Sequence, residues 1–152
     1  MIAVGTKPPA WVREATQEYS KRLPPEFKLE WCEVRPQTRG PSGHAPAWMA
    51  AEAQRIREAI PTGATLIVLD ERGEDLSSRA LATRLERWRE RSAPLAIIIG
   101  GPDGLDPVLK SQGHEQIRLS SLTLPHPLVR VVLAEQLFRA CAILAGHPYH
   151  RE

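Results

Sequence analysis

Two short, uninterrupted apolar runs constrain the fold of this chain more than any other feature. Residues 65–69 (TLIVL) and 95–99 (LAIII) are rich in β-branched side chains, and polar residues do not alternate with apolar ones within them. Such runs are typical of strands that are covered on both faces, as in a parallel sheet. Helical patterns lie between and around them, so the sequence predicts an α/β fold with a mostly parallel sheet and helices on both faces.

The remaining segments continue this alternation. Further strands are expected at residues 2–4, 27–34 and 116–120. Helices are expected after Pro8, around residues 49–60, after a cap at Ser77 or Ser78, and from Pro127 to Ala145. The first helix should bury a stripe of Trp11, Ala15, Tyr19 and Leu23, and the third a stripe of Leu81, Leu85 and Trp88. Residues 37–43 should form a mobile loop, and residues 70–75 a polar connection.

Composition limits the classes of protein to which the chain can belong. Its 152 residues suit a single domain spanning residues 1–152, and the net charge of +2 does not by itself indicate nucleic-acid binding. The two cysteines form no Cys-x-x-Cys pair, and we expect no metal site. The start lacks the pattern of a signal peptide, and apolar runs are too short for a membrane span. We therefore expect a cytoplasmic protein with no membrane partner.

The last expected helix is unusual because apolar side chains occupy most of its circumference. Between residues 128 and 144 the polar residues are few: Arg130, Glu135, Gln136 and Arg139. A helix of this kind must be buried on nearly all sides. A central core helix would satisfy that requirement, but sheets carry helices on their faces, so we favour burial against both its own sheet and a second subunit, in a homodimer.

Glycine and proline gather where expected strands end. Residues 100–104 (GGPDG) follow one buried strand, and residues 119–126 (LSSLTLPH) follow the last one. Ligands of open α/β sheets bind beyond the carboxyl ends of the strands, and glycine lets a backbone approach a ligand closely. Taken alone, GGPDG is better explained as a tight turn. It matches neither the dinucleotide fingerprint nor a P-loop.

The longer strings resemble a known family. The segments IIIGGPDGL, LSSLTLPHPLVRVVLAEQLFRA and HPYHRE, supported by LDERGEDLSS and AVGTKPPAWV, are similar to the signature segments of the RlmH family of the SPOUT class. The resemblance implies a C-terminal trefoil knot, which periodicity alone would never suggest. It also implies a homodimeric enzyme that uses S-adenosylmethionine (SAM) to methylate N3 of a pseudouridine in 23S ribosomal RNA, at the helix 69 site of the assembled ribosome.

The resemblance also implies the residues of the site. Carried over by position, the SAM pocket would comprise Leu69, Gly100, Leu119, Ser120, Ser121, Leu122, Thr123 and Leu124. Methyl transfer from a sulfonium needs no metal, but the N3 proton must be removed. The candidates for this and for gripping the RNA are His126, Tyr149, His150 and Arg151. His126 is equally well explained as a residue that orders the start of the helix, and the tail as a frayed terminus.

Other observations leave alternatives open. Candidate RNA-contacting charges are Lys7, Lys21, Arg22, Arg39, Arg130 and Arg151, whereas the arginines of residues 84–91 are better explained as a solvated helix face. A ribosome-binding factor that has lost the chemistry and a flavodoxin-like nucleotide-binding module are the alternative functions. SAM titration would separate them from a methyltransferase.

Overall fold

The computed structural model describes residues 1–149. The chain forms two compact units, each assembled from segments that are distant in sequence. The first unit contains Met1–Lys7, Glu30–Glu74 and Pro94–Arg118, and the second contains Pro8–Leu29, Asp75–Ala93 and the chain from Leu119 onward. The expectation of a single domain stays a prediction, and the two units are described separately.

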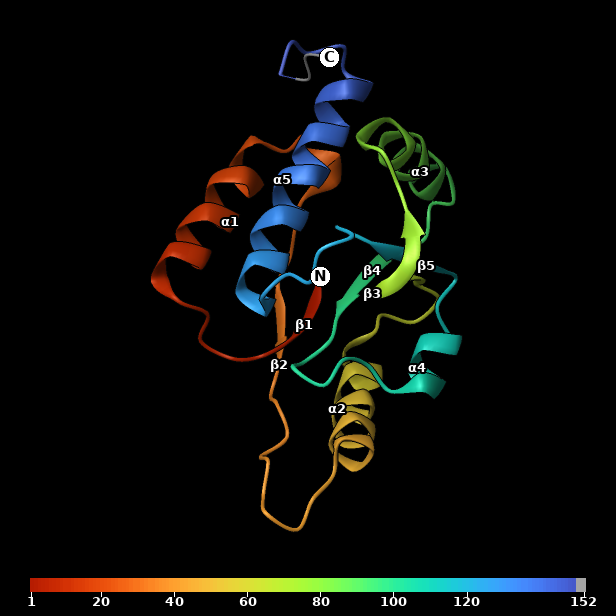
Figure 1. Cartoon of the computed structure of the whole chain (residues 1–152). Coiled ribbons are helices and arrows are strands. Elements are labelled where there is room, and N and C mark those ends of the chain that lie inside the picture. Colours follow the sequence, from red (N-terminus) through yellow and green to blue (C-terminus); the bar gives the residue numbers. More distant parts are fainter. Residues whose placement is uncertain (150–152) are drawn as a thin grey trace. The chain divides into compact units, whose positions relative to one another are not determined.

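The first unit is built on a five-stranded sheet with the strand order β2-β1-β4-β3-β5 (Figure 1). The strands are β1 (Ile2–Val4), β2 (Cys32–Val34), β3 (Thr65–Asp75), β4 (Leu95–Ile99) and β5 (Glu115–Arg118). β1 pairs in parallel with β2 and with β4, and β4 pairs in parallel with β3. The predicted α/β fold with a mostly parallel sheet is therefore confirmed.

One face of this sheet carries the core of the first unit. Ile2, Val4, Val68 and Ile98 point to a cluster that includes Ile56 of α2 (Ala45–Ala59). The short helix α4 (Pro107–Ser111) adds Leu109, which is completely buried. The intervening residues Ala3, Ile67 and Ile97 are buried too, as expected for strands that are covered on both faces.

The structure corrects two expectations for strands and adds one helix. β2 is only Cys32–Val34 rather than residues 27–34, and Phe27 belongs instead to a 3-10 turn, η1 (Pro25–Phe27), which Pro25 opens. β3 continues to Asp75, through the segment expected to be a polar connection. A Cβ on its Gly73 would lie 2.5 Å from the carbonyl carbon of Ile117, so this glycine lets β3 and β5 approach closely. Helix α4 was not predicted from the sequence.

The second unit consists mainly of three helices, α1 (Ala10–Arg22), α3 (Ser78–Glu90) and α5 (His126–Leu144). α5 lies between α1 and α3 and packs on both (Figure 1). The side chain of Ser77 caps α3 by accepting a hydrogen bond from the amide of Ala80. The predicted stripe of α3 is confirmed by the burial of Leu81, Leu85 and Trp88. α1 ends where Leu23 turns extended before Pro24.

The predicted stripe of α1 is partly wrong. Trp11 is 48% exposed, and the buried positions are Val12 and Thr16. A threonine tolerates this position because its hydroxyl donates to the carbonyl of Val12 at 2.8 Å. Tyr19 does face the helix layer, with its ring centroid 6.1 Å from that of Phe138 on α5.

α5 is deeply buried within one protomer. Eight of its 19 residues are buried, including Leu133, Leu137 and Arg130. Leu128, near its N-terminus, is 39% exposed. A large part of the apolar circumference is therefore covered without a second subunit, and the homodimer stays a prediction. Among residues 1–149, no helix is long and apolar enough to span a membrane.

Candidate functional site

Two predicted pocket residues, Leu69 and Gly100, come together at one edge of the sheet. β3 and β4 are parallel, and Val68 lies opposite Ile98 in their register. Leu69 directly follows Val68, and Gly100 directly follows the last residue of β4. The carboxyl edge of a parallel sheet is the place where α/β proteins bind ligands. The structure therefore brings these two residues to a suitable position.

Gly100 leads into a tight four-residue turn, which we call the glycine turn (residues 101–104). The amide of Gly104 donates to the carbonyl of Gly101 at 3.0 Å, and Pro102 occupies the second position, where it is favoured in a type I turn. Gly104 has a φ of 87°, a conformation that suits glycine. A Cβ on Gly100 would lie 2.9 Å from the Gly104 carbonyl. The sequence-based alternative of a tight turn is thus correct, and it is compatible with ligand binding.

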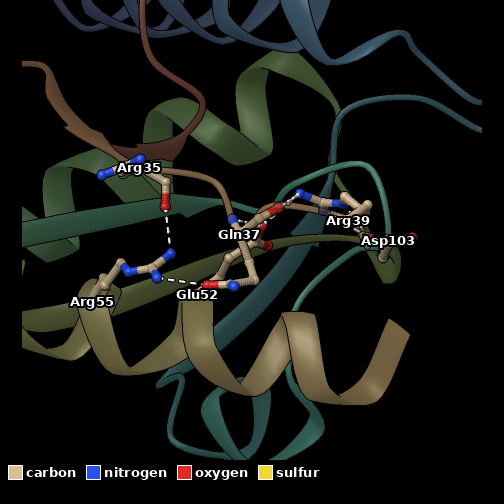
Figure 2. A network of polar contacts seen from close by, with 6 residues as sticks. All are labelled: Arg35, Gln37, Arg39, Glu52, Arg55 and Asp103. Atoms are coloured by element: carbon tan, nitrogen blue, oxygen red, sulfur yellow. Dashed lines mark hydrogen bonds and ion pairs between the residues drawn. The ribbon is translucent and has the colours of Figure 1, made fainter. Parts of the chain in front are cut away.

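The glycine turn is joined to the chain after β2 through Arg39 (Figure 2). Arg39 donates through Nε and Nη2 to Oδ2 of Asp103, at 3.1 and 2.7 Å. Its Nη1 donates to Oε1 of Glu52 at 2.9 Å and to the carbonyl of Gln37 at 2.7 Å. The segment expected to be a mobile loop is therefore tied down at Gln37 and Arg39.

Glu52 is the buried centre of this network. Its side chain is 2% exposed, and Oε1 also accepts a hydrogen bond from the amide of Gln37 at 2.8 Å. Oε2 is buried without a hydrogen-bond partner among the described residues. It lies 2.9 Å from the position that a Cβ on Gly101 would occupy. The carboxylate of Glu52, in the middle of α2, is therefore packed directly against the glycine turn.

A second ion pair lies near Leu69. Oδ2 of Asp70 accepts a hydrogen bond from Nζ of Lys110 at 2.9 Å, and Oδ1 accepts one from the amide of Arg72. Burial pushes the pKa of Asp70 upward, but the bonds from Lys110 and Arg72 outweigh it and hold the pKa below its ordinary value. Asp70 is therefore ionised at neutral pH and is not a proton donor.

The other predicted pocket residues lie in the second unit. Residues 119–124 form an irregular segment before α5, in which Ser120 Oγ accepts a hydrogen bond from the amide of Leu122 at 2.9 Å. The Leu122 side chain is 76% exposed, and Ser121 and Thr123 are exposed too. His126 is the first residue of α5 and is half-buried. An exposed leucine beside exposed hydroxyl groups is compatible with a ligand that has both apolar and polar parts.

Tyr149 is the one residue of the predicted catalytic tail that the structure describes. Its ring packs edge-on against Phe138 at 4.7 Å, and its hydroxyl donates to Oε1 of Glu135 at 3.2 Å. The guanidinium groups of Arg22 and Arg139 lie 5.4 and 5.0 Å from its ring centroid. These contacts differ from those of a frayed terminus, the alternative that the sequence left open for the tail. His150 and Arg151 lie outside the described residues.

The environment of Tyr149 also limits its chemistry. Burial, followed by the nearby charge and hydrogen bond of Glu135, raises the pKa of the phenol above its ordinary value. A phenol with a raised pKa stays protonated at neutral pH, so it can donate a hydrogen bond but does not accept a proton.

Two of the candidate RNA-contacting charges are engaged elsewhere. Arg130 is only 3% exposed, and Arg39 is held by two carboxylates. Lys7, Lys21 and Arg22 are exposed, as expected for residues that could meet a phosphate. Within residues 1–149, no group of three or more metal-ligating side chains is present.

Sequence reasoning missed Glu52 and the role of Asp103. Glu52 stands among the apolar positions of α2, next to Ala53 and four residues before Ile56, and that position was the available signal. Asp103 was read only as part of a turn. Their shared partner, Arg39, is 64 residues away from Asp103 in sequence, a contact that no local pattern reveals.

Comparisons with known proteins point to one family. The family described as "Predicted SPOUT methyltransferase" matches residues 1–150. The chain is 60% identical to a "Ribosomal RNA large subunit methyltransferase H" of Bordetella petrii, over 99% of this chain and 97% of that protein. A protein of the same name from Ralstonia pickettii is 52% identical, again over 99% and 97% of the two chains.

A solved structure supports the fold. A probable methylase family protein from Haemophilus influenzae Rd KW20 superposes with a TM-score of 0.59 at 13% identity, covering 99% of this chain and 69% of the other. At this identity the likeness concerns the fold alone.

Proposed function

This chain belongs to the SPOUT methyltransferase family, and from this premise we propose that it methylates N3 of a pseudouridine in 23S ribosomal RNA with SAM as the methyl donor. The resemblance seen in the motifs is confirmed by the family match. The observation that carries the substrate is the 60% identity, over nearly the whole of both chains, to a protein named as a large-subunit rRNA methyltransferase. The helix 69 site and the assembled ribosome belong to the proposal.

The residues at the carboxyl edge of the sheet suit SAM. Gly100 offers a backbone without a Cβ beside Leu69. In the second unit, Leu122 presents an exposed apolar side chain. Adenosine needs both apolar contact and backbone hydrogen-bonding groups. In this proposal Leu69 and Gly100, together with the segment from Leu119 to Leu124, hold the cofactor, which supplies an activated methyl group.

The chain's own part in the chemistry is alignment and proton removal. Transfer forms a bond from N3 to the methyl carbon while the carbon–sulfur bond breaks, and the N3 proton must pass to a base. Tyr149 is unsuited to that step because its pKa is raised by burial and by Glu135. The acceptor is therefore sought at His126 or His150, with Tyr149 and Arg151 positioning the base and the phosphate.

The remaining expectations complete the proposal. The enzyme would work in the cytoplasm as a homodimer on the ribosome, its C-terminal part threaded as a trefoil knot. Residues that stay exposed in one protomer, such as Leu128, are the natural place to look for the partner subunit.

The experiment is methyl incorporation from labelled SAM into ribosomes that carry or lack the target pseudouridine. We expect incorporation only when pseudouridine is present, and calorimetric SAM binding in the isolated protein. SAM binding without methylation would point to a ribosome-binding factor. Absence of both would refute the proposal and leave a nucleotide-binding module as the alternative.

A chain ending at Pro148 tests the tail. We expect nearly unchanged SAM binding and a collapse of turnover on ribosomes. A stability loss of about 1 kcal/mol should accompany it, because the edge-on contact of Tyr149 with Phe138 is removed. Tyr149→Phe is the matched control for the stability loss, since it keeps the ring that packs on Phe138 and removes only the hydroxyl. Full methylation by the truncated chain would move the proton acceptor to His126.

A further inference from the structure

We propose that Glu52, Arg39 and Asp103 form a brace that holds the glycine turn in the shape that accepts the cofactor, with Arg39 and Glu52 as positioning residues. Figure 2 shows Arg39 between the two carboxylates, with α2 running beneath the network. The inference rests on the proposed function, because it assigns a task to residues next to Gly100.

The first argument is that Arg39 uses all three of its nitrogens in hydrogen bonds within the protein. Three of its nitrogens donate to Asp103, Glu52 and the carbonyl of Gln37. The hydrogen bond with Asp103, aided by the charge of Glu52, raises its guanidinium pKa further. A guanidinium used in this way is a rigid fork that fixes the geometry of both carboxylates.

The second argument is the position of Glu52. A carboxylate that is 2% exposed is costly, and an apolar side chain of similar volume would serve stability as well or better. Its neighbour Ala53 and the following Ile56 belong to the apolar core. Stability alone therefore does not explain the charge of Glu52. Its contacts do: Oε1 accepts a hydrogen bond from Arg39, and Oε2 lies against Gly101.

The third argument is the place of Asp103. It is the third residue of the glycine turn, between Pro102 and Gly104, so the ion pair of its side chain with Arg39 fixes the position of the turn. Gly100 enters this turn and has the Gly104 backbone directly beside it. A shift of the turn would therefore move the backbone that the cofactor is proposed to meet.

The test compares SAM binding in wild type, Asp103→Ala and Asp103→Glu, with methylation kinetics on ribosomes. Asp103→Ala should raise the SAM dissociation constant by about 10-fold, the order expected for a lost charge-assisted hydrogen bond. It should raise KM for SAM while kcat at saturating SAM stays near wild type. Asp103→Glu keeps a carboxylate and should recover most of the affinity. Glu52→Gln keeps the shape and the acceptor oxygen, and should weaken binding in the same direction.

Arg57→Gln is the matched control. Arg57 also lies on α2 and pairs with Asp106 at 3.6 Å, but it does not touch the glycine turn. We expect its SAM affinity to stay within about twofold of wild type. Unchanged affinity in Asp103→Ala, or an equal loss in Arg57→Gln, overturns the brace while wild-type binding leaves the proposed function standing. Wild-type protein that binds no SAM overturns both.

Discussion

The replacement of Gly100 by alanine tests whether the fold itself requires this glycine. A Cβ there would lie 2.8 Å from Cγ of Leu105 and 2.9 Å from the Gly104 backbone. Real Cβ atoms essentially never come closer than 3.0 Å to a neighbour, so the turn must move. Enlarging Gly100, for example to valine, should therefore disturb the fold as well as SAM binding.

The magnitude follows from two opposing effects. Forcing an extra methyl group into a packed site costs about 1–3 kcal/mol. The alanine also reduces the entropy of the unfolded chain, which returns about 0.4–1 kcal/mol. We expect Gly100→Ala to lower the free energy of unfolding by about 1–2 kcal/mol. For a chain of this size, each kcal/mol corresponds to a decrease in Tm of about 2–4 °C. SAM affinity should fall together with stability.

The assay is urea unfolding followed by circular dichroism, with SAM calorimetry on the same samples. Gly40→Ala is the control, because a Cβ there meets nothing within 4 Å and the residue lies in the same unit. It should be neutral or slightly stabilising. If Gly100→Ala proves as stable as Gly40→Ala, the close approach of Gly104 is refuted as a constraint.

Three further outcomes are expected. Leu133→Glu should unfold the protomer because Leu133 is completely buried. Leu128→Glu, at a 39% exposed position, should dissociate a dimer without unfolding the protomer. Wild-type protein that sediments as a monomer at micromolar concentration would refute the dimer. The pKa of Asp70 is lowered in the folded protein, so its ionisation stabilises the fold above the ordinary pKa of 3.8, and this stabilisation is lost as the pH falls through the native pKa. Lys110→Met should therefore reduce the loss of unfolding free energy at acid pH, as urea titrations at several pH values would show. An unchanged pH dependence would contradict a contribution from the Asp70–Lys110 pair. Burial raises the pKa of Cys141 to about 11, so iodoacetamide at pH 8 should modify exposed Cys32 and spare Cys141, as mass spectrometry would show; equal labelling would contradict the buried thiol.

Local chemistry was enough to predict much of the fold. Residues 65–69 and 95–99 were expected as buried strands, and both lie in the sheet, because an unbroken apolar run needs cover on both faces. A serine cap at residue 77 or 78 and the buried stripe of α3 followed from residue type and helical spacing, and the structure selects Ser77 as the cap. The glycine and proline of residues 100–104 likewise required a turn.

Other features depended on contacts between distant segments. Phe27 was expected at the start of a strand, but it lies in the 3-10 turn that begins at Pro25. The polar residues after Leu69 stay in a strand because β5 pairs with β3, which Gly73 permits by lacking a Cβ next to Ile117. In α1 the buried face is chosen by its packing on α5, which is why Trp11 is exposed and Val12 is buried.

The candidate site shows the same division. The sequence determined which residues carry backbone freedom and charge: Gly100 at a strand end, and Arg39 in a segment predicted to be a mobile loop. Only the tertiary structure decided that Arg39 meets Asp103 and the buried Glu52. The physical reason is that a buried charge must find an opposite charge and hydrogen bonds in space, and such a partner leaves no periodic trace along the chain.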